Sequence, residues 1–127
     1  MTGSVQLKQV GFYKSAEDLL AVVGSAQYPW EPMAVRYLEQ GMTVLVSPGW
    51  VDDLLDPQAK MICQYSTLTD GKWVWSSDLS YYLRAYHVAL PDEFVAHMAS
   101  RDWVVPELGE AELDAICEHL EKQHGLS

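Results

Sequence analysis

The sequence has no long apolar run, few basic residues and only two cysteines, and each of these scarcities narrows the range of functions. No apolar stretch approaches the ~20 residues that a transmembrane helix requires. The N-terminus lacks a basic start followed by an apolar stretch, so no signal peptide is expected. Cys63 and Cys117 lie far apart in unlike contexts. This favours two reduced thiols in a cytoplasmic protein over a disulfide framework.

Basic residues are scarce beside acidic ones. Eight lysines and arginines stand against eighteen acids, which gives a formal net charge of −10. A nucleic-acid-binding protein needs a basic surface to displace counterions, and an anionic membrane would repel this chain. A basic protein partner, in contrast, would be attracted and steered onto it. A second interpretation stays open, because acidity also serves solubility alone.

The remaining composition is that of a globular protein. The chain has 127 residues, of which 49% are hydrophobic. A chain of this size buries roughly two thirds of its unfolded surface, which is enough for one core. No internal repeat, low-complexity tract or linker divides it. We therefore predict a single α+β domain over residues 1–127, in which helices pack on a small antiparallel or mixed sheet.

Alternating and apolar patterns predict strands at residues 5–13, 43–46, 61–68 and 72–76. The first strand changes its phase of alternation, which indicates a bulge or bend near Gln9. The second has no polar face, so it is expected to be a central strand that ends at Ser47-Pro48-Gly49. The last two flank Asp70-Gly71, a strong hairpin signal because glycine accepts the positive φ that a tight turn requires.

Capping residues and apolar periodicity predict the helices. The first is expected from the N-cap Ser15 to Gly24, and the second from Pro32 to Gln40. The third is expected to be capped by Ser76 or Ser77 and to run through Tyr86 with one buried stripe. Two more helices are expected at 91–98 and 110–122, with a short extended piece at 103–105 between them.

Residue types that carry catalysis occur without the spacing that catalysis needs. Histidine and cysteine are not paired as in a structural zinc site, so neither a metal nor another cofactor is expected. The cysteines fall mid-strand and on an apolar helical stripe, where thiols serve packing. No nucleophile elbow or glycine-rich phosphate loop is present. An enzymatic alternative stays open, in which His97 or His87 combines with Asp78 or Asp92 in a cleft.

The tryptophans divide into two groups. Trp73 and Trp75 project to the same face of a predicted strand, which favours a place in the core. Trp30 and Trp50 stand in loops that contain proline or glycine and adjoin acids. Such residues are either exposed anchors for a partner or tucked under the sheet, and both interpretations stay open.

One segment resembles a pattern of small bacterial proteins. It runs Thr-Asp-Gly-Lys-Trp-Val-Trp-Ser-Ser-Asp-Leu-Ser-Tyr-Tyr-Leu from Thr69 and continues with Tyr-His-Val-Ala-Leu-Pro-Asp-Glu-Phe from Tyr86. Some of these proteins resemble immunity proteins of bacterial toxin systems. Immunity proteins are small, often acidic, single-domain and non-enzymatic, and each binds a cognate toxin. The resemblance therefore implies a protein–protein function.

These observations together favour a non-enzymatic binding protein. The leading hypothesis is an immunity protein or inhibitor that neutralises a basic toxin, for instance a nuclease, through acids around an exposed aromatic residue. The predicted contact residues are Trp50, Asp52, Asp53, Glu110, Asp114 and Glu118. Two alternatives are a small enzyme with a histidine and carboxylate cleft, and a structural subunit that forms a homodimer or larger homo-oligomer.

Overall fold

A four-stranded sheet with the order β1-β4-β3-β2 is the scaffold of the structure, a computed structural model that describes residues 7–123. The strands are β1 (Lys8–Val10), β2 (Met42–Val51), β3 (Cys63–Thr69) and β4 (Trp73–Ser76). β1 pairs with β4 in parallel, whereas β2 with β3 and β3 with β4 are antiparallel. The sheet is therefore mixed, and the predicted α+β class is confirmed.

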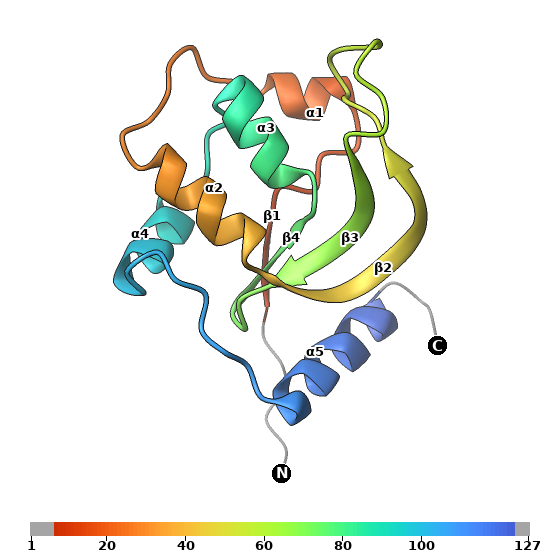
Figure 1. Ribbon diagram of the computed structural model, residues 1–127, viewed down its shortest axis with the longest axis vertical. Helices are drawn as coiled ribbons and strands as arrows, with labels where there is room; N and C mark the ends of the chain where they lie inside the picture. The colour runs from red at the N-terminus through yellow and green to blue at the C-terminus, as the bar shows by residue number, and fades with distance from the viewer. Residues whose placement is uncertain (1–6, 124–127) are drawn as a thin grey trace.

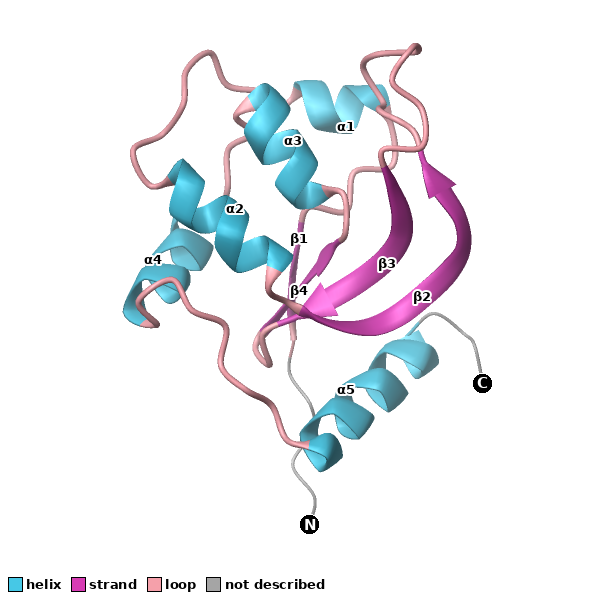
Figure 2. Ribbon diagram, viewed as in Figure 1, coloured by secondary structure: helices cyan, strands magenta, loops and turns pink. Residues whose placement is uncertain are grey.

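Helices cover both faces of this sheet (Figures 1 and 2). The described residues form α1 (Ala16–Leu20), α2 (Glu31–Glu39), α3 (Leu79–Tyr86), α4 (Asp92–Ser100) and α5 (Glu110–Gln123). The first four lie on one side of the sheet, and α5 lies against the other (Figure 1). None of the helices in the described part of the chain combines the length and apolar character that a membrane span requires.

Alternation along β4 divides the core in two. Trp73 and Trp75 face the helices α1 to α4, where both are buried as predicted. Val74, between them, faces α5. Because helices cover both faces, every residue of β4 is buried. The smaller core beneath α5 consists of Val44, Val74, Ile116 and Leu120.

Strand β2 corrects a prediction. It is an edge strand rather than a central one, and it continues through Ser47-Pro48-Gly49 instead of ending there. Its register against β3 shifts between Val46 and Trp50. An edge strand tolerates such a bulge and a proline without N–H, because no neighbour requires that donor. The apolar run was misleading because Val44 packs beneath α5 and is buried, whereas Val46 projects from the opposite face of the sheet, where it is 62% exposed.

Two helix predictions need correction at their ends. Ser15 caps α1 as predicted, and its hydroxyl accepts from the N–H of Asp18 at 3.2 Å. The helix nevertheless ends at Leu20, because the backbone beyond it bonds elsewhere: the carbonyl of Val22 accepts from the N–H of Ala89 at 2.7 Å. Asp78, and neither serine before it, is the N-cap of α3.

Local hydrogen bonds and backbone dihedral angles explain the other differences between the predicted and the observed elements. Ser77 cannot cap α3, because its hydroxyl donates to the carbonyl of Gln64 and accepts from the N–H of Ser66. The bend expected near Gln9 falls at Gly11, which has φ +78°. Residues 5 and 6 of that predicted strand lie outside the described residues. Trp103 has φ +60° and lies in a turn, so the extended piece expected at 103–105 does not form.

Candidate functional site

The two loop tryptophans that the sequence left open differ in the structure. Trp30 stacks on Tyr28 with ring centroids 4.7 Å apart, and it packs against the larger core. Trp50 is 58% exposed near the end of β2. Trp50 pairs with Gln64 and Val46 pairs with Ser66, so Trp50 and Val46 project from the same face of the sheet.

Other exposed groups adjoin Trp50. The carboxylate of Asp52 accepts from the backbone N–H of Met61 at 2.9 Å, and the side chain of Met61 is exposed. No strand within the described residues pairs with the outer edge of β2. That edge therefore offers unpaired backbone donors and acceptors beside apolar side chains. We call Val46, Trp50, Asp52 and Met61 the edge surface.

Asp53 cannot contact a partner as predicted, because it is 5% exposed. Its carboxylate accepts hydrogen bonds from the hydroxyls of Tyr81 and Tyr86, at 2.7 and 2.6 Å. Burial acts to raise the pKa of Asp53, but the bonds from both tyrosines and from two backbone amides hold it below its ordinary value. Asp53 therefore anchors the loop after β2 to α3.

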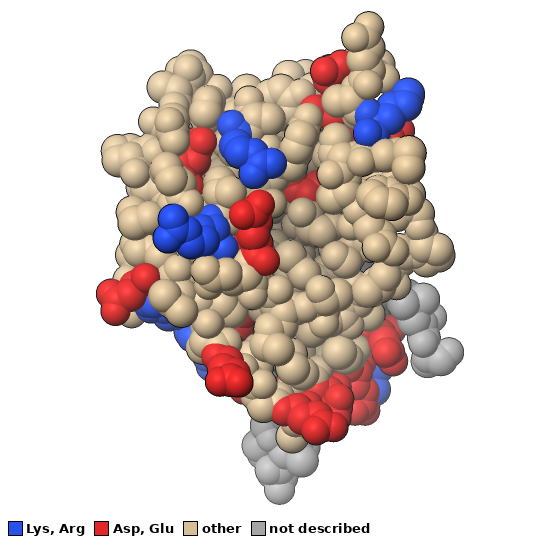
Figure 3. Space-filling view, in the orientation of Figure 1, with Lys and Arg blue, Asp and Glu red and all other residues tan. Residues whose placement is uncertain are grey.

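The acids on α5 are exposed, as predicted for Glu110, Asp114 and Glu118. Residues 107–122 hold six acids and one lysine, so this segment supplies −5 of the chain's formal charge of −10. In the space-filling view, acidic side chains gather over α5 at the lower end of the molecule (Figure 3). The end of β2 lies at the opposite end of the same view (Figure 1). The predicted contact residues thus form two separate groups.

Strand β2 connects these two groups. Its start lies beneath α5, where the Cys117 thiol donates to the carbonyl of Val44 at 3.2 Å. Its end carries Trp50. Ten residues of strand span about 33 Å. A partner that lies along β2 would therefore approach the acids of α5 at one end and Trp50 at the other.

The predicted histidine and carboxylate combinations are wrong. His87 pairs with Glu31 at 2.8 Å, and His97 pairs with Asp70 at 2.8 Å. Neither histidine pairs with Asp78 or Asp92. The actual partners come from the start of α2 and from the hairpin turn, which are distant in sequence, and for this reason residue spacing did not reveal them.

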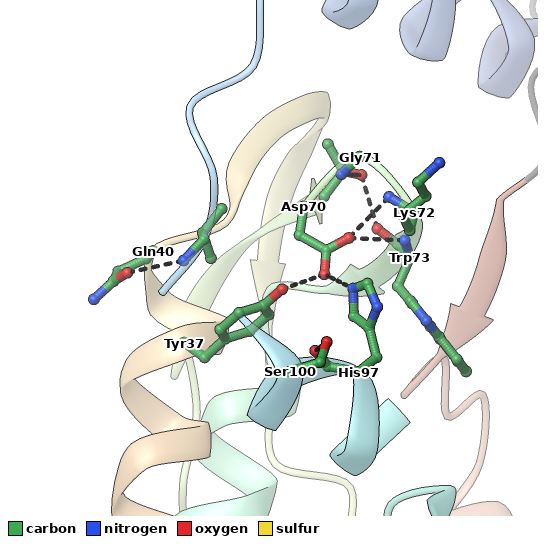
Figure 4. Close-up of polar contacts among 10 residues, drawn as sticks. Tyr37, Gln40, Asp70, Gly71, Lys72, Trp73, His97 and Ser100 are labelled. Carbon is green, nitrogen blue, oxygen red and sulfur yellow. Dashed lines mark hydrogen bonds and ion pairs between the residues drawn. The ribbon is translucent and has the colours of Figure 1, made fainter. Parts of the chain in front are cut away.

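The carboxylate of Asp70 joins three parts of the chain (Figure 4). One oxygen accepts from the hydroxyl of Tyr37 on α2 and from Nε2 of His97 on α4. The other accepts from two backbone amides of the turn, those of Lys72 and Trp73, each at 2.9 Å. Burial, and next the bond to Asp70, raises the pKa of Tyr37 far above its ordinary value. Asp70 itself is 1% exposed, so this network is interior.

His97 also lines an open cleft of about 520 Å³. Lys8, Lys72 and Arg101 line the same cleft together with Glu93, which forms an ion pair with Lys8, so the lining carries a small excess of positive charge. Among the described residues, the lining of this cleft includes no serine, threonine or cysteine, and the Nε2 atom of His97 bonds to Asp70. The excess of basic side chains favours an anion over a cation in this cleft.

The cysteines are packing residues in this structure. Burial raises the pKa of both thiols, so both are protonated and poorly nucleophilic at neutral pH. In the part of the chain that the structure describes, no three histidine, cysteine, aspartate or glutamate side chains come together as metal ligands would. The two thiols contact Ser77 and the carbonyl of Val44.

Comparison with protein-family models, with curated proteins and with solved structures finds no match. The candidate site therefore rests on the geometry of the chain itself. Sequence reasoning missed Tyr37 and Glu31 as polar partners, because each lies in a helix whose apolar periodicity gives no signal for a tertiary hydrogen bond. It identified Asp70 as a turn residue but not the helices that this carboxylate binds.

Replacing Asp70 should test the interior network. Asp70→Asn leaves an amide where Tyr37 and His97 both donate, so we expect unfolding in urea to show a loss of about 3 kcal/mol. Asp102→Asn is the matched control on an exposed acid, and it should change stability by less than about 0.5 kcal/mol. Equal stability of both variants would contradict the role assigned to Asp70.

Alkaline pH should destabilise the fold through tyrosines whose pKa is raised. Burial raises the pKa of Tyr13 and Tyr82 to about 12, and the bond to Asp53 raises that of Tyr81 to about 12, from an ordinary 10.0. Because these folded values exceed the unfolded ones, their contribution is complete below about pH 10 and is lost as pH rises towards about 12. Urea unfolding across this range should show the decline.

The tyrosine variants supply the control for the alkaline experiment. Tyr81→Phe removes one titrating hydroxyl, so the decline in stability with pH should become shallower. Tyr65→Phe, at a tyrosine that is 43% exposed, should leave the decline as it is. A pH dependence that is the same in Tyr81→Phe and the wild type would show that Tyr81 does not contribute to it.

Proposed function

We propose that this chain is a non-enzymatic protein of immunity type, which binds and neutralises a basic protein partner such as a toxin. The observation that carries the proposal is the exposed edge surface, where Trp50 is 58% and Val46 62% exposed beside an unpaired strand edge. Tryptophan is among the residues that dominate binding energy at protein interfaces. An extended segment of a partner can add to such an edge through backbone hydrogen bonds.

The acids of α5 have a different part in this proposal. Together with the residues just before the helix, they supply half of the net negative charge of the chain. Exposed charges of this kind accelerate the encounter with a basic partner more than they strengthen the final complex. Four acids, Glu31, Asp53, Asp70 and Asp78, are buried and belong to the interior. The partner-facing field therefore comes mainly from the fourteen others.

The cleft beside His97 favours a second candidate function. Lys72 and Arg101, which lie beside the Lys8–Glu93 ion pair and His97, suit a small anion, either as a ligand or as a substrate. Loss of a measured activity in His97→Ala, with the fold intact, would support this candidate. A homo-oligomer is a third arrangement, because a second copy can also pair with the edge of β2. Sedimentation of the purified protein distinguishes self-association from binding of another protein.

Trp50 should be the anchor of the complex. With the product of the adjacent gene as partner, we expect Trp50→Ser to raise the Kd about tenfold or more. Leu20→Ser is the matched control, since Leu20 is an apolar side chain on α1 that is 59% exposed, and it should leave the Kd unchanged. An equal Kd for Trp50→Ser and the wild type, measured by calorimetry, would remove the edge surface from the interface.

Charge on α5 should set the association rate. Asp114→Lys should slow association about three- to tenfold at low salt and leave the dissociation rate unchanged. Added salt should reduce the difference from the wild type, because it screens exposed charges. Glu17→Lys makes the same change in charge on α1, on the other side of the sheet, and should have a smaller effect. Equal association rates for Asp114→Lys and the wild type would contradict steering by α5.

A further inference from the structure

The four buried carboxylates of this chain are not alike. Glu31 bonds His87 and the N–H of Tyr28, while Asp53 and Asp70 each accept four hydrogen bonds. Asp78 is also buried, at 6% exposure, but its Oδ1 atom has no hydrogen-bond partner among the described residues. A buried polar atom without a partner is costly, so it requires an explanation.

The position of Asp78 makes the missing bond more informative. Asp78 is the N-cap residue of α3, a position at which aspartate usually accepts from a backbone N–H of the first helical turn. Its side chain makes no such bond. Lys14 lines the same cavity, yet within the described residues no ion pair joins it to Asp78. The Ser76 hydroxyl and the backbone N–H of Asp78 bond to the carboxylate, but among the residues that the structure describes Oδ1 has no donor and no cation is paired with the group.

Asp78 lines a cavity of about 420 Å³ on the α5 side of the sheet. Val51, Thr67, Val74 and Ser76 form its sheet wall, and Leu120 closes it from α5. Tyr13 and Tyr65 add aromatic rings. This volume falls within the range of about 300–1,000 Å³ that is typical of small-molecule sites, and mostly apolar walls with a few polar groups are typical as well.

The charge of the cavity indicates the ligand. Burial raises the pKa of Asp78, and the nearby Asp78 carboxylate contributes to the raised pKa of Tyr13 after burial itself. A cation beside the Asp78 carboxylate would relieve both effects. Aromatic faces also attract cations. Lys14 is at the cavity wall as well, but an anion beside Asp78 would be repelled, and a purely apolar ligand would leave the buried carboxylate without a cation.

We propose that this cavity binds a small organic amine, with its ammonium group on the carboxylate of Asp78 and its apolar part between Tyr13, Tyr65 and Leu120. The site is separate from the edge surface and does not depend on the proposed protein partner. The buried carboxylate of Asp78, at the start of α3, has no paired cation among the described residues because the ligand supplies it.

Calorimetry with the purified chain tests this site. The probes are 2-phenylethylamine and cyclohexylmethylamine, and the neutral comparison is 2-phenylethanol. We expect saturable binding of at least one amine, about tenfold or more tighter than the alcohol. No saturable binding by any amine would overturn the proposal, as would equal binding of the alcohol. Tighter binding of Nα-acetyl-lysine amide would overturn it in favour of a lysine side chain from a protein.

Variants separate Asp78 from general effects. Asp78→Asn keeps the shape but removes the charge, so amine binding should weaken about tenfold or more. Asp102→Asn, at an exposed acid outside the cavity lining, should bind as the wild type does. If Asp78→Asn does not fold, Thr67→Leu fills the cavity from the sheet wall and should block binding. Unchanged amine binding in whichever of these two variants folds would overturn the proposal.

Discussion

The buried carboxylate of Asp70 is the interaction on which the rest of the fold depends. It accepts from a tyrosine on α2, a histidine on α4 and two amides of its own turn. The hairpin that carries Trp73 and Trp75 is thereby fixed to the helices that cover those rings. Among the described helices, only α5 covers the other face of the sheet, and the end of β2 remains exposed.

Local signals predicted the hairpin and the helices, because caps, turns and apolar periodicity act within a few residues. They could not predict which carboxylates lie inside. Asp52 and Asp53 are neighbours in sequence, yet the first is exposed and the second is bound by two tyrosines of α3. The apolar run of β2 was misread for a related reason, since an apolar strand reveals nothing about which helix covers it.

Buried and exposed acids have different roles in the proposed function. Interior carboxylates hold the turn, the loop after β2 and the start of α2, and Asp78 is the exception that lines a cavity. Surface acids concentrate on α5, and two exposed apolar side chains, Val46 and Trp50, lie on the edge strand β2. A basic protein that lies along β2 would use both the charge and the edge. The cavity is a separate site, suited to a small cation.

Recognition of a toxic partner is tested most directly by growth of a sensitive host that expresses the adjacent open reading frame. We expect that gene product to stop growth when expressed alone, and co-expression of this chain to restore growth. Trp50→Ser, present at the same soluble level, should fail to restore it, because the anchor of the edge surface is gone. Toxicity that the wild-type chain does not relieve, or equal rescue by Trp50→Ser, would contradict the account.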